Sequence, residues 1–222
     1  MDVHLARDAR KALIALGCEI YETNLGRKPL GWKEILALTH NDRGFDITSS
    51  EALDPTTRFY DWLSYEIINN SPDYCFIPFG TGNLYENVLN ITKHEVSARH
   101  HDPRFSGDIA RLRRCNFLGA TSNNINSKAD KLYSPHLPFV HYDEQWIHLY
   151  RSAGFCGPES NVCPVEERFL DHAMTLASSQ GFACEYSGIA GLALLLQRRR
   201  SIQKTKKILI VNTGKTKMLL VA

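Results

Sequence analysis

The sequence predicts an α/β fold, a three-layer sandwich in which helices cover both faces of a mostly parallel sheet. Residues 74–79 are continuously apolar, as a strand buried on both faces of a parallel sheet must be. After Pro164, apolar side chains recur at helical spacing up to Gly181, which predicts a helix with Glu166 and Glu167 in its first turn. Helical and strand-like segments alternate along the chain, and this order favours parallel strands.

The first half of the chain contains five predicted elements. Apolar stripes at helical spacing and turn residues such as Gly17 mark the helices, whereas short apolar runs mark the strands. In chain order they are a helix over residues 5–16, a strand over 18–21, and helices over 31–41 and 59–67, before the strand over 74–79.

The second half is less regular. Residues 94–143 are rich in Asn, Ser, Pro and His, and they predict only one strand, over 117–120. The helix that starts at Pro164 follows. The remaining predicted elements are a strand over 182–185, an apolar helix over 189–197 and a strand over 208–211.

Composition and charge narrow the class of protein. The 222 residues are 43% apolar and 23% charged, which is enough to bury a core, and the net charge of +2 is too small for the whole surface to attract nucleic acid. No apolar run reaches the roughly 20 residues that span a bilayer, and residues 1–20 lack a secretory signal, so we expect a cytoplasmic protein without a membrane partner. The six cysteines are too scattered for a zinc site and predict reduced thiols.

In such sheets ligands bind beyond the carboxyl ends of the strands. Gly80-Thr81-Gly82-Asn83-Leu84 follows the strand over 74–79 and leads into a short predicted helix through Val88. Two glycines allow backbone N–H groups to converge on an anion, and a following helix adds its positive end. A phosphate group fits this pattern, and an ordinary turn fits it as well.

Two further loops follow predicted strands. Residues 186–193 are small enough to let a helix pack closely on the sheet, and Asn212-Thr213-Gly214 places a hydroxyl at the end of the last strand. Gly214-Lys215-Thr216 does not form a Walker A loop, because Leu209 stands where that motif needs its first glycine. The six cations between residues 198 and 207 favour a solvated connection over an anion-binding surface.

Three motifs, in this order, resemble the second half of the fold type II pyridoxal-phosphate enzymes, the tryptophan synthase beta and threonine synthase superfamily. They are F-I-P-F-G-T-G-N-L at residues 76–84, C-E-Y-S-G-I-A-G-L-A at 184–193 and N-T-G at 212–214. The segment R-F-Y-D-W-L-S-Y-E-I at 58–67 is also similar to the helix that precedes the phosphate loop in this family. The resemblance covers most of residues 1–217.

The resemblance implies that the chain binds pyridoxal phosphate. Gly80, Thr81, Gly82, Asn83 and Leu84 would surround the cofactor phosphate, and Thr213 would face the pyridine nitrogen. A neutral hydroxyl does not keep that nitrogen protonated, which suits the eliminations and replacements typical of the family. The loop has only two glycines where many relatives have more, and Lys215 follows Gly214 where relatives continue with another glycine.

The resemblance also implies that a catalytic element is absent. The family binds the cofactor to a lysine in a Ser/Asn-x-Lys context, and a Ser/Thr-x-Gly-Asn loop binds the substrate carboxylate. Neither occurs before Gly80, and Asn126-Ser127-Lys128 lies after the phosphate loop, where the family has no catalytic lysine. We therefore assign no catalytic residue and expect both elements upstream of Met1.

These observations set the expected organisation and function. Residues 1–45 would be a remnant of the small domain, and residues 46–222 the large cofactor-binding domain. The expected function is a partial pyridoxal-phosphate protein with an amino-acid substrate, incomplete without a lysine-bearing half. The alternative is a non-catalytic binding or scaffold protein that keeps the fold and pairs with another chain or with itself. Substrate and reaction stay open, and nucleic acid is not an expected partner.

Overall fold

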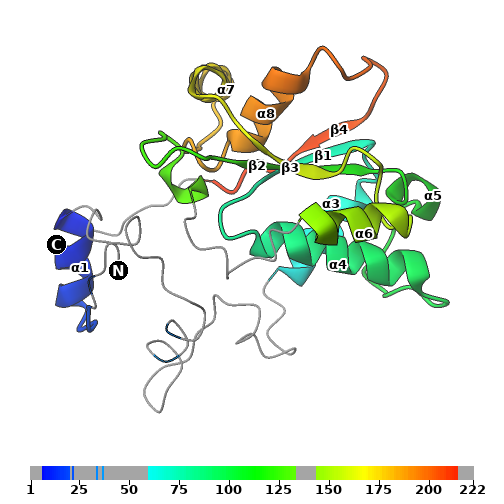
Figure 1. Cartoon of the computed structure of the whole chain (residues 1–222), viewed down its shortest axis with the longest axis horizontal. Helices are drawn as coiled ribbons and strands as arrows, with labels where there is room; N and C mark the ends of the chain where they lie inside the picture. The colour runs from blue at the N-terminus through cyan, green and yellow to red at the C-terminus, as the bar shows by residue number, and fades with distance from the viewer. Residues whose placement is uncertain are drawn as a thin grey trace.

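The computed structural model of the chain describes residues 7–20, 22, 34, 37, 60–133 and 144–214. At its centre lies a four-stranded sheet in the order β3-β2-β1-β4 (Figure 1). The strands are β1 (Tyr74–Pro78), β2 (Asn116–Thr121), β3 (Asn161–Pro164) and β4 (Ile208–Ile210). All neighbouring strands are parallel, which confirms the predicted fold class.

Helices cover both faces of this sheet. Figure 1 shows α7 and α8 on one face and α3, α4 and α6 on the other. The bounds of the helices are α1 Arg7–Ala15, α3 Asp61–Asn69, α4 Asn83–Ser97, α5 Ile109–Leu112, α6 Glu144–Ser152, α7 Glu167–Ser179 and α8 Ala190–Arg198, with a 3₁₀ turn, η1, at Asp130–Leu132.

The central strand β1 contributes to two separate cores because its side chains alternate between the faces. Cys75 and Ile77 pack with apolar residues of α3, α4 and α6. Tyr74 and Phe76 pack instead with apolar residues of α7 and α8. Every residue of β1 is buried, as the continuous apolar run predicts.

Two predicted strands are wrong. Cys18–Ile20 is not a strand, since the Cys18 N–H donates to the Leu13 carbonyl 3.1 Å away in the turn that closes α1 at Gly17 (φ +80°). Residues 182–185 are not a strand either. The Glu185 N–H donates to the Gly214 carbonyl, and the side-chain amide of Asn212 donates to the Ala183 carbonyl. Both partners, Gly214 and Asn212, lie beyond the end of β4.

The start of one helix and the length of another also differ from the prediction. Pro164 ends β3, opposite Thr121, and α7 begins only at Glu167 after an extended Glu166. The helix after the two glycines is 15 residues long and continues well past Val88, because Leu89, Thr92 and Val96 extend its buried face. The predicted helix over 31–41 lies outside the described residues except for Glu34 and Ala37, which are helical.

The boundary between residues 45 and 46 also lies outside the described residues. In the described part of the chain, no helix is long and apolar enough to cross a membrane. All six cysteines are free thiols.

Candidate functional site

Gly82 connects the central strand to the longest described helix. It follows β1 by four residues and is the N-cap of α4, with φ +84° and ψ −6°, a left-handed conformation that glycine adopts without strain. No side chain caps α4. The first-turn N–H groups have no partner within a helix, so they and the positive end of the helix dipole face the loop formed by residues 80–84, which we call the glycine loop.

Gly80 is required for a different reason. A Cβ at this position would lie 2.5 Å from the carbonyl oxygen of Lys131, closer than a side chain tolerates. The turn η1, which follows β2, therefore packs directly on the glycine loop. This contact positions the loop but does not involve an anion.

Lys131 links η1 to the segment before α8. Its Nζ atom lies 2.6 Å from Glu185 Oε1, and its backbone N–H donates to Ser187 Oγ at 3.2 Å. Lys131 thus contacts Gly80 through its carbonyl, Glu185 through its side chain and Ser187 through its backbone N–H.

Gly188 continues this chain of contacts to the end of β4. A Cβ at Gly188 would lie 2.4 Å from the Gly214 carbonyl oxygen. The Thr213 N–H donates to the Gly188 carbonyl at 3.3 Å, and the Glu185 N–H donates to the Gly214 carbonyl at 3.2 Å. Four loops after β1, β2, α7 and β4 are therefore packed together at the carboxyl edge of the sheet.

The six predicted binding residues lie in the loops that follow two neighbouring strands, β1 and β4. Phe76 of β1 lies opposite Ile210 of β4, so the glycine loop and Thr213 start from strands about 4.8 Å apart. Gly82 and Leu84 are buried, Asn83 is half-buried, and Thr81 and Thr213 are exposed. The Asn212 side chain accepts from the Gly214 N–H at 2.9 Å, which fixes the turn after Thr213.

The loop with Ser187 was predicted at this edge, but the contacts of Lys131 with Glu185 and Ser187 were not predicted. Lys131 lies in the irregular segment between β2 and β3, where no periodic pattern marks its position. Gly191 does confirm a prediction, since a Cβ there would lie 2.8 Å from the Phe76 carbonyl oxygen, and only a glycine permits that close packing of α8 on β1.

Lys128 is engaged in an ion pair. Its Nζ atom lies 2.6 and 2.8 Å from the two carboxylate oxygens of Asp171 on α7, and this hydrogen-bonded pair raises the pKa of Lys128. Tyr186 also donates to Asp171, at 3.3 Å. These contacts give Lys128 a structural role on the surface.

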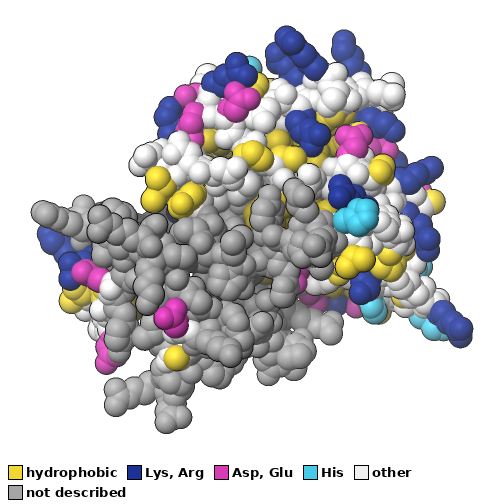
Figure 2. All heavy atoms as spheres, viewed as in Figure 1, with side chains coloured by type: hydrophobic (Ala, Val, Ile, Leu, Met, Phe, Trp, Pro, Cys, Tyr) yellow, Lys and Arg dark blue, Asp and Glu magenta, His cyan; other side chains and the backbone are white. Residues whose placement is uncertain are grey.

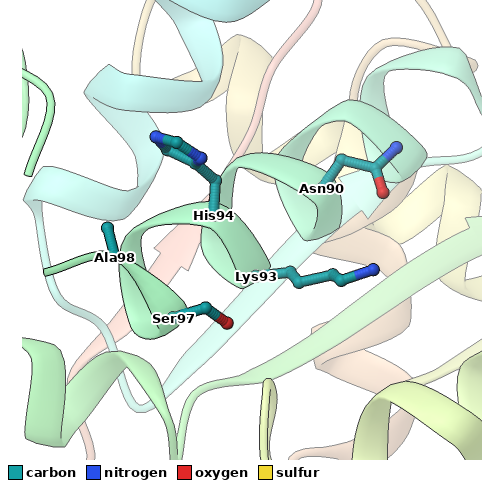
Figure 3. Close-up of a pocket in the computed structure, with 5 residues that line it drawn as sticks. All are labelled: Asn90, Lys93, His94, Ser97 and Ala98. Carbon is teal, nitrogen blue, oxygen red and sulfur yellow. The ribbon is translucent and has the colours of Figure 1, made fainter.

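A hollow of about 420 Å³ lies on the outer face of α4, away from the glycine loop. It is lined by residues at helical spacing, namely Asn90, Lys93, His94, Ser97 and Ala98. Figure 3 shows that these side chains point in different directions and do not converge on one point. The Nζ atom of Lys93 instead lies 5.6 Å from the centre of the Tyr150 ring on α6. The carboxyl edge is thus the better candidate site.

The chain matches no protein-family model, and no curated protein matches it. Among solved structures it is similar to O-ureido-L-serine synthase, with a TM-score of 0.59, 14% identity, and coverage of 96% of this chain and 64% of that one. A variant of that synthase with O-ureido-L-serine bound gives a TM-score of 0.57, 15% identity, and coverage of 97% and 63%.

The chain spans less than two thirds of the length of these two structures. At this identity the likeness concerns the fold alone. It agrees with the parallel sheet and with the helices on both of its faces. The chain has the fold of the fold type II pyridoxal-phosphate enzymes.

Proposed function

We propose that the chain binds the phosphate group of pyridoxal phosphate in the glycine loop, as the large-domain part of a protein that acts on an amino acid. The observation that carries the proposal is Gly82, a left-handed glycine at the uncapped start of a 15-residue helix, four residues after the central strand. A helix N-terminus with converging N–H groups is a favourable place for an anion.

The residues at the carboxyl edge fit this cofactor. The glycine loop offers neutral N–H donors of the kind that bind phosphate, and Gly82 has no Cβ to obstruct them. Thr213, at the end of the neighbouring strand, offers a neutral hydroxyl for the ring nitrogen. When bound, pyridoxal phosphate supplies an electron sink for carbanion chemistry at an amino acid.

The proposal includes a lysine from elsewhere. Two lysines of the described carboxyl edge, Lys128 and Lys131, are ion-paired with Asp171 and Glu185 at 2.6 Å. Lys128 stands in an Asn-x-Lys sequence but after the phosphate loop, where the family has no catalytic lysine, and Lys131 stands in no such sequence. We therefore expect the lysine, and the loop that binds the substrate carboxylate, to come from another half of the protein or a partner chain.

Thermal unfolding with and without ligand tests the proposal. Pyridoxal phosphate and inorganic phosphate should each raise the melting temperature, because a ligand bound only to the folded state stabilises it by about 2.7 kcal/mol at a hundredfold excess over Kd. Pyridoxal, which lacks the phosphate, should have no effect. Gly82→Val should abolish the shift, since a branched residue at φ +84° strains the loop and enters the anion's path.

Gly181→Val is the matched control. Gly181 has φ +77° and lies at the end of α7, away from the loop, so valine there introduces comparable strain without touching the site. This variant should melt lower but keep the full ligand shift. If wild-type protein shows no shift with either anion at millimolar concentration, the cofactor proposal is wrong and the scaffold alternative takes its place.

A further inference from the structure

The amino-terminal edge of the sheet, opposite the glycine loop, collects cations from two distant parts of the sequence. One group lies on and after α5, just before β2: Arg111, Arg113 and Arg114. The other lies between the end of α8 and β4: Arg198, Arg199, Arg200, Lys204, Lys206 and Lys207. We call these nine residues the basic face. Figure 2 shows dark-blue side chains along the upper and right-hand margins, where Figure 1 places these segments.

A single carboxylate brings the two groups together. Asp73 precedes β1, and its Oδ2 atom accepts from the backbone N–H of Lys207 at 2.8 Å and from Arg111 Nη2 at 3.4 Å. The strands β2, β1 and β4 are neighbours, so their amino ends lie side by side. The basic face therefore spans two strand spacings, about 10 Å, before the length of the side chains is added.

Most of this positive charge is not neutralised within the described residues. Arg114, Arg199, Arg200, Lys204 and Lys206 are exposed, and none forms an ion pair with a residue that the structure describes. The whole chain has a net charge of only +2, so the positive charge gathered at this edge is balanced by negative charge elsewhere in the chain.

The acidic groups beside the basic face are already engaged. Asp73 pairs with Arg111. Asp108 accepts from the Arg111 N–H as the cap of α5, and Glu159 accepts from the Tyr74 hydroxyl at 2.7 Å. The exposed cations thus remain available to an external anion.

The surroundings indicate which anion fits. The large exposed apolar side chains of the described chain all lie in other segments, for example Trp62, Leu149 and Phe182. A protein partner would need an apolar centre to its interface, and a membrane surface would favour side chains that insert among lipids. A face of arginine and lysine alone suits a row of phosphates.

The run at 198–207 alone favours a solvated connection, but the fold places it beside the arginines after α5. We therefore propose that the basic face binds the phosphate backbone of single-stranded nucleic acid without reading its bases. The long arginine and lysine side chains extend the 10 Å span at both ends, so we expect the basic face to contact about three phosphates of one strand. Binding through about three phosphates should release counterions, so log Kd should depend on log salt with a slope of about 2.

Fluorescence anisotropy with the full chain and a labelled 12-nucleotide single strand of thymidines tests the proposal. At 50 mM salt we expect saturable binding in the micromolar range, weakened with the stated slope as salt rises. The double variant Arg114→Glu/Lys206→Glu should bind at least tenfold more weakly and with a shallower slope. Lys11→Glu/Lys93→Glu makes the same charge change outside the basic face and should bind as wild type does.

Three other outcomes would overturn the proposal. The first is no binding of the labelled strand at 100 μM protein. The second is an equal loss of affinity in the two double variants. The third is that a polyglutamate peptide or anionic lipid vesicles displace the labelled strand as well as unlabelled strand does at equal charge. Gly82→Val should keep its affinity for the strand, so failure of this proposal and failure of the cofactor proposal are distinguishable.

Discussion

Gly80 and Gly82 stand two residues apart, and the structure uses the missing side chain of each for a different purpose. Gly82 supplies a left-handed conformation at the start of α4, whereas Gly80 supplies space for the Lys131 carbonyl. From the sequence, the pair fitted either a phosphate-binding loop or an ordinary turn, and the family resemblance implied the phosphate-binding loop. Under the cofactor proposal only Gly82 and the N–H groups after it would bind the phosphate, whereas Gly80 holds the loop against η1.

At the scale of single residues, Lys128 should not react with the cofactor. The hydrogen-bonded pair with Asp171 raises its pKa, so less of the neutral amine that attacks an aldehyde is present at pH 7. Borohydride reduction of the chain with pyridoxal phosphate, followed by peptide mapping, should show no stoichiometric label at Lys128. Asp171→Asn should increase labelling there. A dominant Lys128 label in wild-type protein would contradict the structural role assigned to this residue.

At the scale of elements, Tyr74 connects β1 to the loop before β3. Its hydroxyl donates to Glu159 Oε1 at 2.7 Å, and burial, together with this bond, raises the pKa of Tyr74 to about 12. A raised pKa in the folded state means that the contribution to stability is complete below the unfolded pKa of about 10 and is lost as pH rises through about 12.

In the variant Tyr74→Phe, the free energy of unfolding should therefore decrease less between pH 10 and pH 12 than it does in wild type. Urea unfolding at pH 8, 10 and 11.5 measures this. The variant should lose less free energy of unfolding than wild type between the last two values. Equal losses in both proteins would show that the Tyr74–Glu159 bond does not couple to folding.

Elements with a clear apolar period were predictable from sequence, and elements set by tertiary contacts were not. The run at β1 and the stripe of α7 reflect burial, so their patterns predict them. In contrast, β3 is short and ends in Pro164, a residue equally suited to a helix start. The turn η1 owes its place to contacts with Gly80 and Ser187, which leave no periodic signal in the sequence.

The same reason limits the prediction of the site. Gly82 and Thr213 follow strands that the apolar pattern reveals, so the sequence places both at the carboxyl edge. Glu185 and Lys131 are 54 residues apart, and only the fold joins them. Residues 182–185 resemble a strand because the first three are apolar, but the segment packs beside the loop after β4, where no strand ladder is available.

At the scale of the whole molecule, both apolar cores contain buried cysteines. Cys75, Cys115 and Cys156 lie in the core beneath α4, and Cys184 lies in the core beneath α7 and α8. Burial raises the pKa of the Cys75, Cys115 and Cys156 thiols, which disfavours the reactive thiolate. Cys18 is exposed.

Maleimide labelling of the reduced, folded chain should thus modify Cys18 rapidly and the four buried thiols only after denaturation. Mass spectrometry of the labelled peptides reads this out residue by residue. Rapid labelling of Cys75 and Cys115 in buffer would mean that the central sheet does not stay folded in this chain.

The two proposals concern opposite edges of the sheet. Its carboxyl edge presents the uncapped start of α4 and the hydroxyl of Thr213, and its amino edge presents the basic face. Both proposals concern phosphate, so a bulk binding signal from phosphate does not separate them. A residue-resolved measurement is required.

Amide ¹H–¹⁵N spectra of the labelled chain during titration with pyridoxal phosphate provide that measurement. The account predicts that the largest shifts occur at the backbone N–H groups of Gly82, Asn83 and Leu84, with smaller shifts at Thr213 and little change at Arg114 or Lys206. Gly181→Val should reproduce these shifts, whereas Gly82→Val should remove them. Shifts confined to the basic face, or none at saturating ligand, would contradict the assignment of the glycine loop as the cofactor's phosphate site.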